Sequence, residues 1–249
     1  MVSLDHFIEA TNAAESSEAV FKHFSKALSE LGYDKICYSL ITDHPSLGLK
    51  AGHGVLRNYS ESWMKHYMAR GYVHLDPVPK YCFSTNRPFS WDWLTSNVTL
   101  SDGEALVMNE AREEGLLSGL AVPLYGVNSE LAGVGLASSA ADIRPDARLL
   151  AQIQALAFQF HIAYTDHEAA VMEHSYSEVS LTSREREILL WAAEGKSDQI
   201  IADIIGVSYP TVRFHMNNIF KKLDANERVL AVVKAIRLGL ILPSYVYKK

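Results

Sequence analysis

The sequence is short of cysteine, of long apolar runs and of paired histidines, and each shortage excludes a class of protein. Its two cysteines, Cys37 and Cys82, have no CxxC spacing, which argues against a disulfide framework and a four-ligand zinc site. None of the ten histidines forms an HxxxH or HExxH pair. No apolar run reaches the roughly 18 residues of a membrane span, and the N-terminus does not resemble a signal peptide. We therefore expect no metal, no membrane contact, and a soluble protein of the cytoplasm.

Catalytic motifs are missing as well. The sequence contains no GxSxG elbow, no nucleophile with an evident base and no phosphate-binding loop. His74 and Asp76 could take part in acid–base chemistry, but nothing nearby completes a catalytic site. We therefore predict a protein that is not an enzyme and needs no cofactor.

Charge is unevenly distributed along the chain. The net charge of -6 would by itself argue against nucleic-acid binding. However, residues 181–249 carry 11 Lys and Arg against 7 Asp and Glu, whereas the rest of the chain carries 12 against 22. An acidic body with a basic C-terminal domain is expected when only that domain contacts phosphates.

The hydrophobic pattern predicts an α+β domain over residues 1–170. Helical spacing of apolar residues predicts three helices, over 20–31, 60–71 and 145–170. Runs of β-forming residues predict four strands, over 35–41, 54–56, 120–125 and 132–136. Helices before and after an antiparallel meander, whose last turn is placed at 128–130, predict an N-terminal α-β-α sandwich. We interpret the polar stretch 171–180 as a linker to a small all-α domain over 181–249.

The C-terminal domain has the helix boundaries of a helix-turn-helix. Thr182 and Glu185 form a capping box, and Ser197 and Ser208 are N-caps of the second and third helices. Gly206 supplies the turn between these two helices, and a fourth helix is predicted over 227–238. In the second helix we expect four isoleucines to be buried, at positions 200, 201, 204 and 205.

The third predicted helix is the candidate recognition helix, because its outward side chains can bind DNA. Arg213 can pair bidentately with a guanine, Asn217 lies one turn further on, and Thr211 also faces outward. We interpret three lysines as phosphate contacts, at Lys196, Lys221 and Lys222. The alternative, an ordinary helical bundle with solvated lysines, accounts less well for the combination of caps, turn and charge.

Residues 181–241 resemble the DNA-binding domain of the LuxR family throughout. The signature positions are filled by Glu185, Leu189, Gly195, Lys196, Ile201, Val212, His215 and Leu223. The resemblance implies a transcription factor that binds an approximately palindromic promoter site as a homodimer, with RNA polymerase as a further candidate partner. In the family the fourth helix contributes to the dimer contact, a role that Val229, Val233 and Ile236 could fill. The motif does not identify the input signal, since several kinds of sensor precede this domain.

The sensor domain concentrates aromatic residues near one carboxylate. Tyr59, Trp63 and Tyr67 recur at intervals of four and therefore share a helix face. Such a stripe is often ordinary core, but it could also line a pocket with polar tips on apolar side chains. Asp76 has no arginine as a sequence neighbour, so we expect an amide N–H of a ligand to be its donor. A phosphorelay receiver is excluded because the sequence lacks the acidic pair and the isolated phosphoacceptor Asp.

This domain is similar, from about Leu4 to His167, to the autoinducer-binding domain of quorum-sensing LuxR proteins. The matching positions are Trp63, Tyr67, Asp76, Pro77, Trp91 and Gly119. In these proteins the ligand is an N-acyl-homoserine lactone. The resemblance implies that Trp63 donates to the lactone carbonyl, Asp76 accepts from the amide N–H, and Tyr59 donates to the acyl carbonyl. It also implies a wall of Tyr67 and Trp91, with Ala111, Leu116 and Ala121 near the ligand.

Two positions depart from the family pattern. Gly135 stands where many relatives have Ser or Thr, and Val78 stands where Thr is frequent. A pocket without these hydroxyls has fewer donors for a 3-oxo group, so we expect an unsubstituted, branched or aromatic acyl group. An alternative is a LuxR-type regulator without a synthase of its own that responds to a non-lactone or exogenous small apolar signal.

Overall fold

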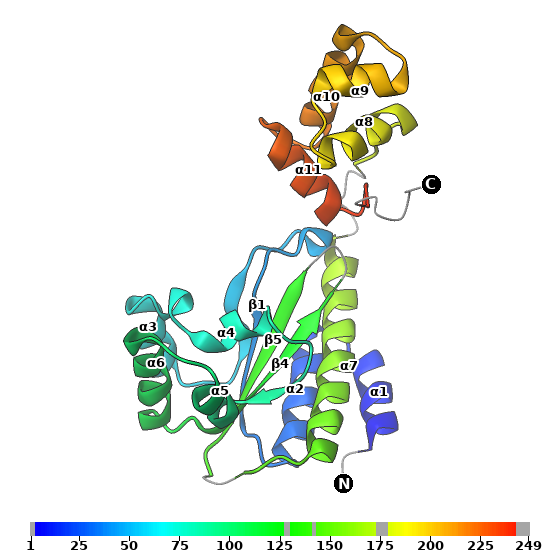
Figure 1. The fold of residues 1–249 in the computed structure, drawn as a ribbon. Helices are drawn as coiled ribbons and strands as arrows, with labels where there is room; N and C mark the ends of the chain where they lie inside the picture. Colours follow the sequence, from blue (N-terminus) through cyan, green and yellow to red (C-terminus); the bar gives the residue numbers. More distant parts are fainter. Residues whose placement is uncertain (1–2, 127–129, 141–142, 173–178, 243–249) are drawn as a thin grey trace. The chain divides into compact units, whose positions relative to one another are not determined.

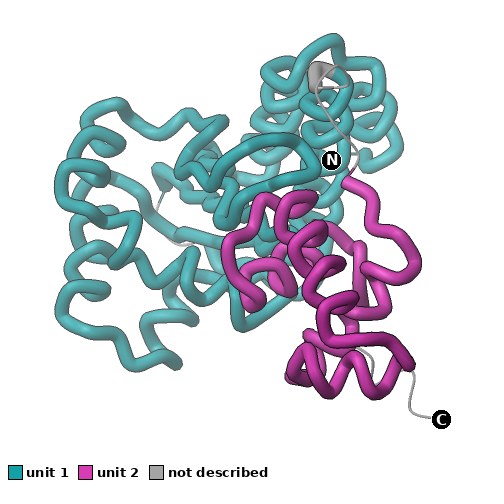
Figure 2. The backbone as a smooth tube through the Cα atoms, turned by 90° about the horizontal axis from the view of Figure 1, so that it is seen from above, with its two compact units in different colours: residues 1–174 teal, residues 175–249 magenta. Residues whose placement is uncertain are grey.

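The chain forms two compact units, Met1–His174 and Ser175–Lys249 (Figure 2). The computed structural model describes residues 3–126, 130–140, 143–172 and 179–242. Among these residues, no helix has the length and apolar character needed to cross a membrane.

The described part of unit 1 contains an antiparallel sheet of five strands in the order β2-β1-β5-β4-β3. Its strands are β1 (Lys35–Leu40), β2 (Gly52–Arg57), β3 (Phe89–Ser90), β4 (Leu117–Tyr125) and β5 (Leu131–Ser138). The four predicted strands are thus found, with shifted ends, while the two-residue edge strand β3 was not predicted. Of the turn predicted at 128–130, residues 128 and 129 lie outside the described residues.

Helices cover both faces of this sheet (Figure 1). On one side lie α1 (Leu4–Asn12), α2 (Ser17–Ser29) and α7 (Ala147–Met172). On the other side lie α3 (Glu61–Ala69), α4 (Pro77–Cys82), α5 (Trp91–Asn97) and α6 (Asp102–Glu113). Two 3₁₀ turns complete the connections, η1 (Pro45–Leu47) and η2 (Tyr72–His74). The predicted α-β-α sandwich is confirmed.

The two faces of the sheet differ in side-chain size. Because side chains alternate along a strand, Ile36, Tyr38 and Leu40 of β1 face α2 and α7. There Tyr38 contacts Phe160 edge-on at 5.0 Å between ring centres, and Phe160 stacks on Phe24 at 4.4 Å. This core fully buries its large side chains, so α2 and α7 pack firmly on the sheet.

Unit 2 consists of four helices in its described part: α8 (Ser183–Ala193), α9 (Asp198–Ile205), α10 (Tyr209–Lys222) and α11 (Arg228–Arg237). The capping box of Thr182 and Glu185 and the N-caps Ser197 and Ser208 form as predicted. Gly206 ends α9 with φ +67°, a conformation that glycine adopts without strain.

The expected burial of α9 is wrong for two of its four isoleucines, and a third, Ile205, is only partly buried. Ile201 is fully buried, but Ile200 is 47% exposed and Ile204 is 44% exposed. A helix of eight residues presents only one narrow face to α8 and α10, and Ile201 and Ala202 occupy that face. Ile200 and Ile204, one turn apart, lie on the adjacent solvent-facing side.

We expect Glu185→Ala to destabilise unit 2 by about 2 kcal/mol, because it removes a capping interaction and a buried carboxylate that pairs with the half-exposed Lys222. Glu185 is 3% exposed and accepts hydrogen bonds from the Thr182 N–H at 2.8 Å and the Lys222 ammonium at 2.7 Å. Hydrogen exchange in α8 and α10, measured on the full chain, reports the change.

Glu187→Ala is the matched control, because Glu187 forms a surface ion pair with Arg184 at 2.6 Å. Its removal should change stability by less than about 1 kcal/mol. Equal protection losses in the two variants would contradict a stabilising role for the buried Glu185 carboxylate.

Candidate functional site

A cavity of about 60 Å³ lies between the sheet and helices α3 to α6. Its floor is made of small residues on the central strands: Cys37, Ser39, Ala121, Gly133 and Gly135. The antiparallel register pairs Cys37 with Gly135 and Ser39 with Gly133, so these small residues stand side by side. Their size is what leaves space above this face of the sheet.

Helix α3 supplies the aromatic wall of the cavity. The Ser60 hydroxyl accepts from the Trp63 N–H and starts the helix, which places Trp63 and Tyr67 one turn apart on its buried side. Tyr59, just before the helix, is 8% exposed and also lines the cavity. The interval of four therefore predicted the shared helix face of Trp63 and Tyr67 correctly, whereas Tyr59 lies before the helix and only lines the same cavity.

Helix α4 closes the cavity on another side and begins with Asp76 as its N-cap. Oδ1 of Asp76 accepts from the Val78 N–H at 2.8 Å, and Oδ2 accepts from the Tyr67 hydroxyl at 2.9 Å. The expectation that Asp76 lacks a donor within the protein is therefore wrong, since Tyr67 reaches it across the η2 turn. Each oxygen still has a lone pair for one further donor.

The environment of Asp76 disfavours its charge. The residue is partly exposed as a whole, but its carboxyl group is enclosed, and this burial raises its pKa to about 6 despite the two hydrogen bonds. The folded pKa lies above the usual value of 3.8, so ionisation opposes folding as the pH rises from about 4 to about 6. A further hydrogen-bond donor would stabilise the ionised form.

Three donors on side chains that line the cavity have no hydrogen-bond acceptor among the described residues. The indole N–H of Trp91 is buried without a hydrogen-bond partner among the described residues. The Tyr59 hydroxyl and the Trp63 indole N–H line the same cavity, and within the described ranges neither forms a hydrogen bond. A cavity with three free donors and one carboxylate suits a ligand that carries several carbonyl oxygens.

His53 and Ser39 add a polar part to the cavity lining. The His53 ring stacks on Tyr67 at 4.3 Å between ring centres, and its Nδ1 lies 3.3 Å from the Ser39 hydroxyl. Burial lowers the pKa of His53 to about 4, so the ring is neutral at pH 7. Burial also raises the pKa of Cys37 to about 12, which leaves it an unreactive thiol.

The Trp91 ring depends on a glycine beneath it. A Cβ atom on Gly119 would lie 1.8 Å from Cδ2 of Trp91, far inside van der Waals contact. Only glycine at this position of β4 allows the indole to lie against the strand. Two groups of buried apolar side chains surround the cavity, one that contains Trp63 and one that contains Val78. Trp91 packs against both groups.

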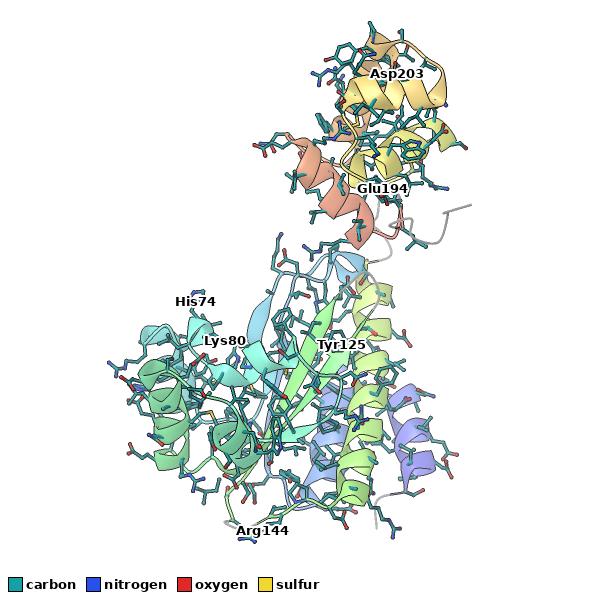
Figure 3. The ribbon with its side chains drawn as sticks, viewed as in Figure 1. His74, Lys80, Tyr125, Arg144, Glu194 and Asp203 are labelled. Atoms are coloured by element: carbon teal, nitrogen blue, oxygen red, sulfur yellow. The ribbon has the colours of Figure 1, made fainter. Side chains whose placement is uncertain are left out.

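Ion pairs hold the covering helices together. Lys80 of α4, labelled in Figure 3, donates to Glu104 of α6 at 2.9 Å. Glu104 also completes a capping box with Ser101 at the start of α6. These contacts lie at the surface and fix α4 and α6 over the small-residue face of the sheet.

The second candidate surface is the exposed side of α10 in unit 2. Arg213, Asn217 and Lys221 are exposed there, and Thr211 is partly exposed. The Arg213 guanidinium lies 3.4 Å from Asp198, whereas Lys221 has no ion pair within the described ranges.

The remaining predicted phosphate contacts differ in their surroundings. Lys196 is partly exposed, in the turn between α8 and α9. Lys222 donates to the buried Glu185 at 2.7 Å, so part of its role is to stabilise the domain.

Comparison with known proteins finds a family model for each of the two units. Residues 16–164 match the model of the autoinducer binding domain, and residues 179–235 match that of bacterial regulatory proteins of the luxR family. The chain belongs to the LuxR family. It is therefore a regulator of transcription with a small-molecule ligand and a DNA-binding helix-turn-helix, and the prediction that it is not an enzyme is confirmed.

Individual LuxR-family proteins match nearly the whole chain. The transcriptional activator SolR of Ralstonia nicotianae is 32% identical, covering 93% of this chain and 96% of SolR. The quorum-sensing regulator RhlR of Pseudomonas aeruginosa is also 32% identical, covering 90% of each chain. The crystal structure of Escherichia coli SdiA has a TM-score of 0.71 and 25% identity, covering 96% of this chain and 98% of that chain.

The structure brings the predicted ligand residues of this LuxR-family chain into one cavity. All nine line it: Tyr59, Trp63, Tyr67, Asp76, Val78, Trp91, Ala111, Leu116 and Gly135. Sequence reasoning missed Ser39 and His53. Strand alternation could have placed Ser39 beside Cys37, but His53 reaches the cavity only through the pairing of β2 with β1, which the sequence does not specify.

We expect Gly119→Ala to expel the Trp91 ring from its position and to lower stability by about 2 kcal/mol, as overpacking of a filled site does. Thermal unfolding and tryptophan fluorescence of the full chain measure both effects. Gly103→Ala in α6 is the control, because its Cβ would meet Leu75 at an ordinary 3.6 Å. A G119A protein with unchanged fluorescence and melting temperature would contradict the contact.

Proposed function

We propose that this regulator binds an N-acyl-homoserine lactone in the cavity under α3 to α6 and controls quorum-sensing genes as a homodimer. The observation that carries the proposal is the match between unpartnered donors and ligand oxygens. Trp63 donates to the lactone carbonyl and Tyr59 donates to the acyl carbonyl, since both line the cavity and neither has an acceptor in the described part of the chain. Asp76 accepts from the amide N–H with a lone pair that Tyr67 and Val78 leave unused.

Ligand binding requires the cavity to expand. Its volume of about 60 Å³ is small beside the roughly 300 Å³ or more of typical ligand pockets. Lining side chains therefore move when the lactone enters, and the ligand becomes part of the core. Because the ligand binds only the folded chain, it raises stability by mass action, by about 2.7 kcal/mol at a hundredfold excess over Kd.

The tail of the ligand lies over the apolar part of the cavity. Ile41, Val78 and Cys82 line this part, and Gly133 and Gly135 offer no hydroxyl. Ser39 and His53 are the nearby polar groups, and each already has the other as a partner. This lining favours an unsubstituted, branched or aromatic acyl group over a 3-oxo group.

DNA recognition follows from the exposed face of α10. Arg213, Asn217 and Thr211 contact base edges in the major groove, while Lys196, Lys221 and Lys222 contact phosphates. Homodimerisation through α11 would place two such helices on a two-fold symmetric site, and Val229 at 72% and Val233 at 46% exposure are available for that contact. RNA polymerase is a candidate further partner at the promoter.

A ligand panel tests the proposed signal. The purified chain is heated with N-butanoyl, N-hexanoyl and N-octanoyl-homoserine lactone, with their 3-oxo forms, and with octanoyl glycerol, which lacks the amide. We expect an unsubstituted lactone to raise the melting temperature by several degrees, more than its 3-oxo form does. Stabilisation by octanoyl glycerol alone would favour a non-lactone signal instead, and stabilisation by no acyl compound would contradict a ligand cavity.

The raised pKa of Asp76 predicts a pH-dependent affinity. An amide N–H binds the ionised carboxylate best, and a pKa of about 6 makes that form scarce at pH 5 and dominant at pH 7. We expect the lactone affinity to rise about tenfold from pH 5 to pH 7, in proportion to the ionised fraction. Calorimetric titration of the chain with the stabilising lactone measures this affinity at each pH.

Asp76→Asn is the matched variant, because the amide keeps an acceptor for the Val78 N–H but does not titrate. Its affinity should be lower at pH 7 and nearly constant between pH 5 and pH 7. A wild-type affinity that is also constant over this range would exclude Asp76 as the acceptor of the ligand N–H.

A further inference from the structure

One carboxylate in unit 2 joins the recognition helix to two other segments. Asp198, the first residue of α9, lies 3.4 Å from the Arg213 guanidinium of α10. Its second oxygen accepts from Arg228 of α11, and Arg228 also donates to the Lys196 carbonyl. The Asp198 side chain is 11% exposed, whereas that of Arg213 is 50% exposed. The carboxylate is thus enclosed, while the arginine it holds faces solvent.

This contact leaves most of the Arg213 guanidinium available. Only Nη1 is engaged by Asp198, so Nη2 and Nε can still donate to a base edge. A free arginine loses rotamer entropy when it is fixed. An arginine that is already held by a carboxylate loses less rotamer entropy when it binds DNA. This favours a DNA contact of defined geometry.

The same carboxylate opposes a contact with phosphate. A phosphate at Arg213 would bring its negative charge close to Asp198, whereas the O6 and N7 atoms of a guanine are neutral acceptors. Repulsion of an incorrect partner is a common source of specificity. Asp198 therefore opposes a contact between Arg213 and a phosphate but not a contact between Arg213 and a guanine.

We propose that Asp198 is a positioning residue that determines specificity, directing Arg213 to a base edge and away from the DNA backbone. The proposal rests on the proposed function in which Arg213 contacts a base. It predicts that discrimination between DNA sequences depends on the Asp198 charge. Asp198 itself touches no DNA in this account.

The test compares Asp198→Asn with the wild-type full chain on two duplexes. One duplex is selected from a random library by the wild-type chain with its stabilising lactone, and the other has the same composition in scrambled order. We expect the ratio of the two Kd values to fall about tenfold in D198N, because non-specific binding tightens while specific binding weakens. The salt slope of non-specific binding should steepen by about 1, as Arg213 joins the phosphate contacts. Failure of the wild-type chain to select any duplex would instead refute the proposed DNA recognition.

Asp203→Asn is the charge-matched control. Asp203, labelled in Figure 3, is exposed on the same helix and accepts a hydrogen bond from the Gln199 side chain at 3.2 Å. The Asp203→Asn substitution removes the same charge from unit 2 and should leave the ratio of the two Kd values within twofold of wild type. If D203N lowers the ratio as much as D198N does, the effect is general electrostatics and the proposal is overturned.

Two further variants separate positioning from a structural role of the network. In an Arg213→Lys background, D198N should no longer change the ratio, whereas an independent additive loss overturns the proposal. Arg213→Ala in the otherwise wild-type chain should weaken binding to the selected duplex much more than to the scrambled one, whereas Lys221→Ala should weaken binding to both duplexes to a similar extent. This last comparison does not require D198N to fold, and a loss of non-specific binding in R213A equal to that in K221A also overturns the proposal.

Discussion

The structure of the sensor depends on the unequal size of side chains on the two faces of one sheet. Across the central strands, Tyr38, Val134 and Val122 form a row on one face, while Cys37, Gly135 and Ala121 form a row on the other. The large row packs against α2 and α7 and anchors the sheet. The small row cannot fill the distance to α3 to α6, because packed layers stand about 10 Å apart. The cavity is thus a consequence of sheet register and residue size.

The polar groups around this cavity are arranged by short local motifs. Asp76 is held by the first turn of α4, and Trp63 by the first turn of α3. The Tyr67 hydroxyl joins the two helices through Asp76, so the carboxylate has both a structural and a proposed recognition role. Because its oxygens already accept two hydrogen bonds, an incoming amide adds to an existing arrangement. The fold thus orients the carboxylate, while the indole N–H of Trp91 has no hydrogen-bond partner among the described residues.

Local signals explain how much could be predicted from the sequence. Helix starts such as Thr182 and Ser208 depend on residues three apart, and the structure reproduces them. The aromatic face of α3 follows from helical spacing alone. The predictions that were wrong or missing concern features that depend on contacts between distant segments. The exposure of Ile200 and Ile204 is set by where α8 and α10 touch α9, and the second donor to Asp76 comes from another helix. Likewise, β3 pairs over only two residues, too few for a recognisable pattern.

Gly135 has a consequence for the evolution of ligand choice. A Cβ atom at this position would lie 3.3 Å from the Tyr59 hydroxyl, a tight approach that needs only a small shift. One nucleotide change can turn some glycine codons into serine codons, and the new side chain would lie beside the Tyr59 hydroxyl. One substitution at this position could therefore shift the ligand preference of such a receptor toward oxygenated signals, with no change to its fold.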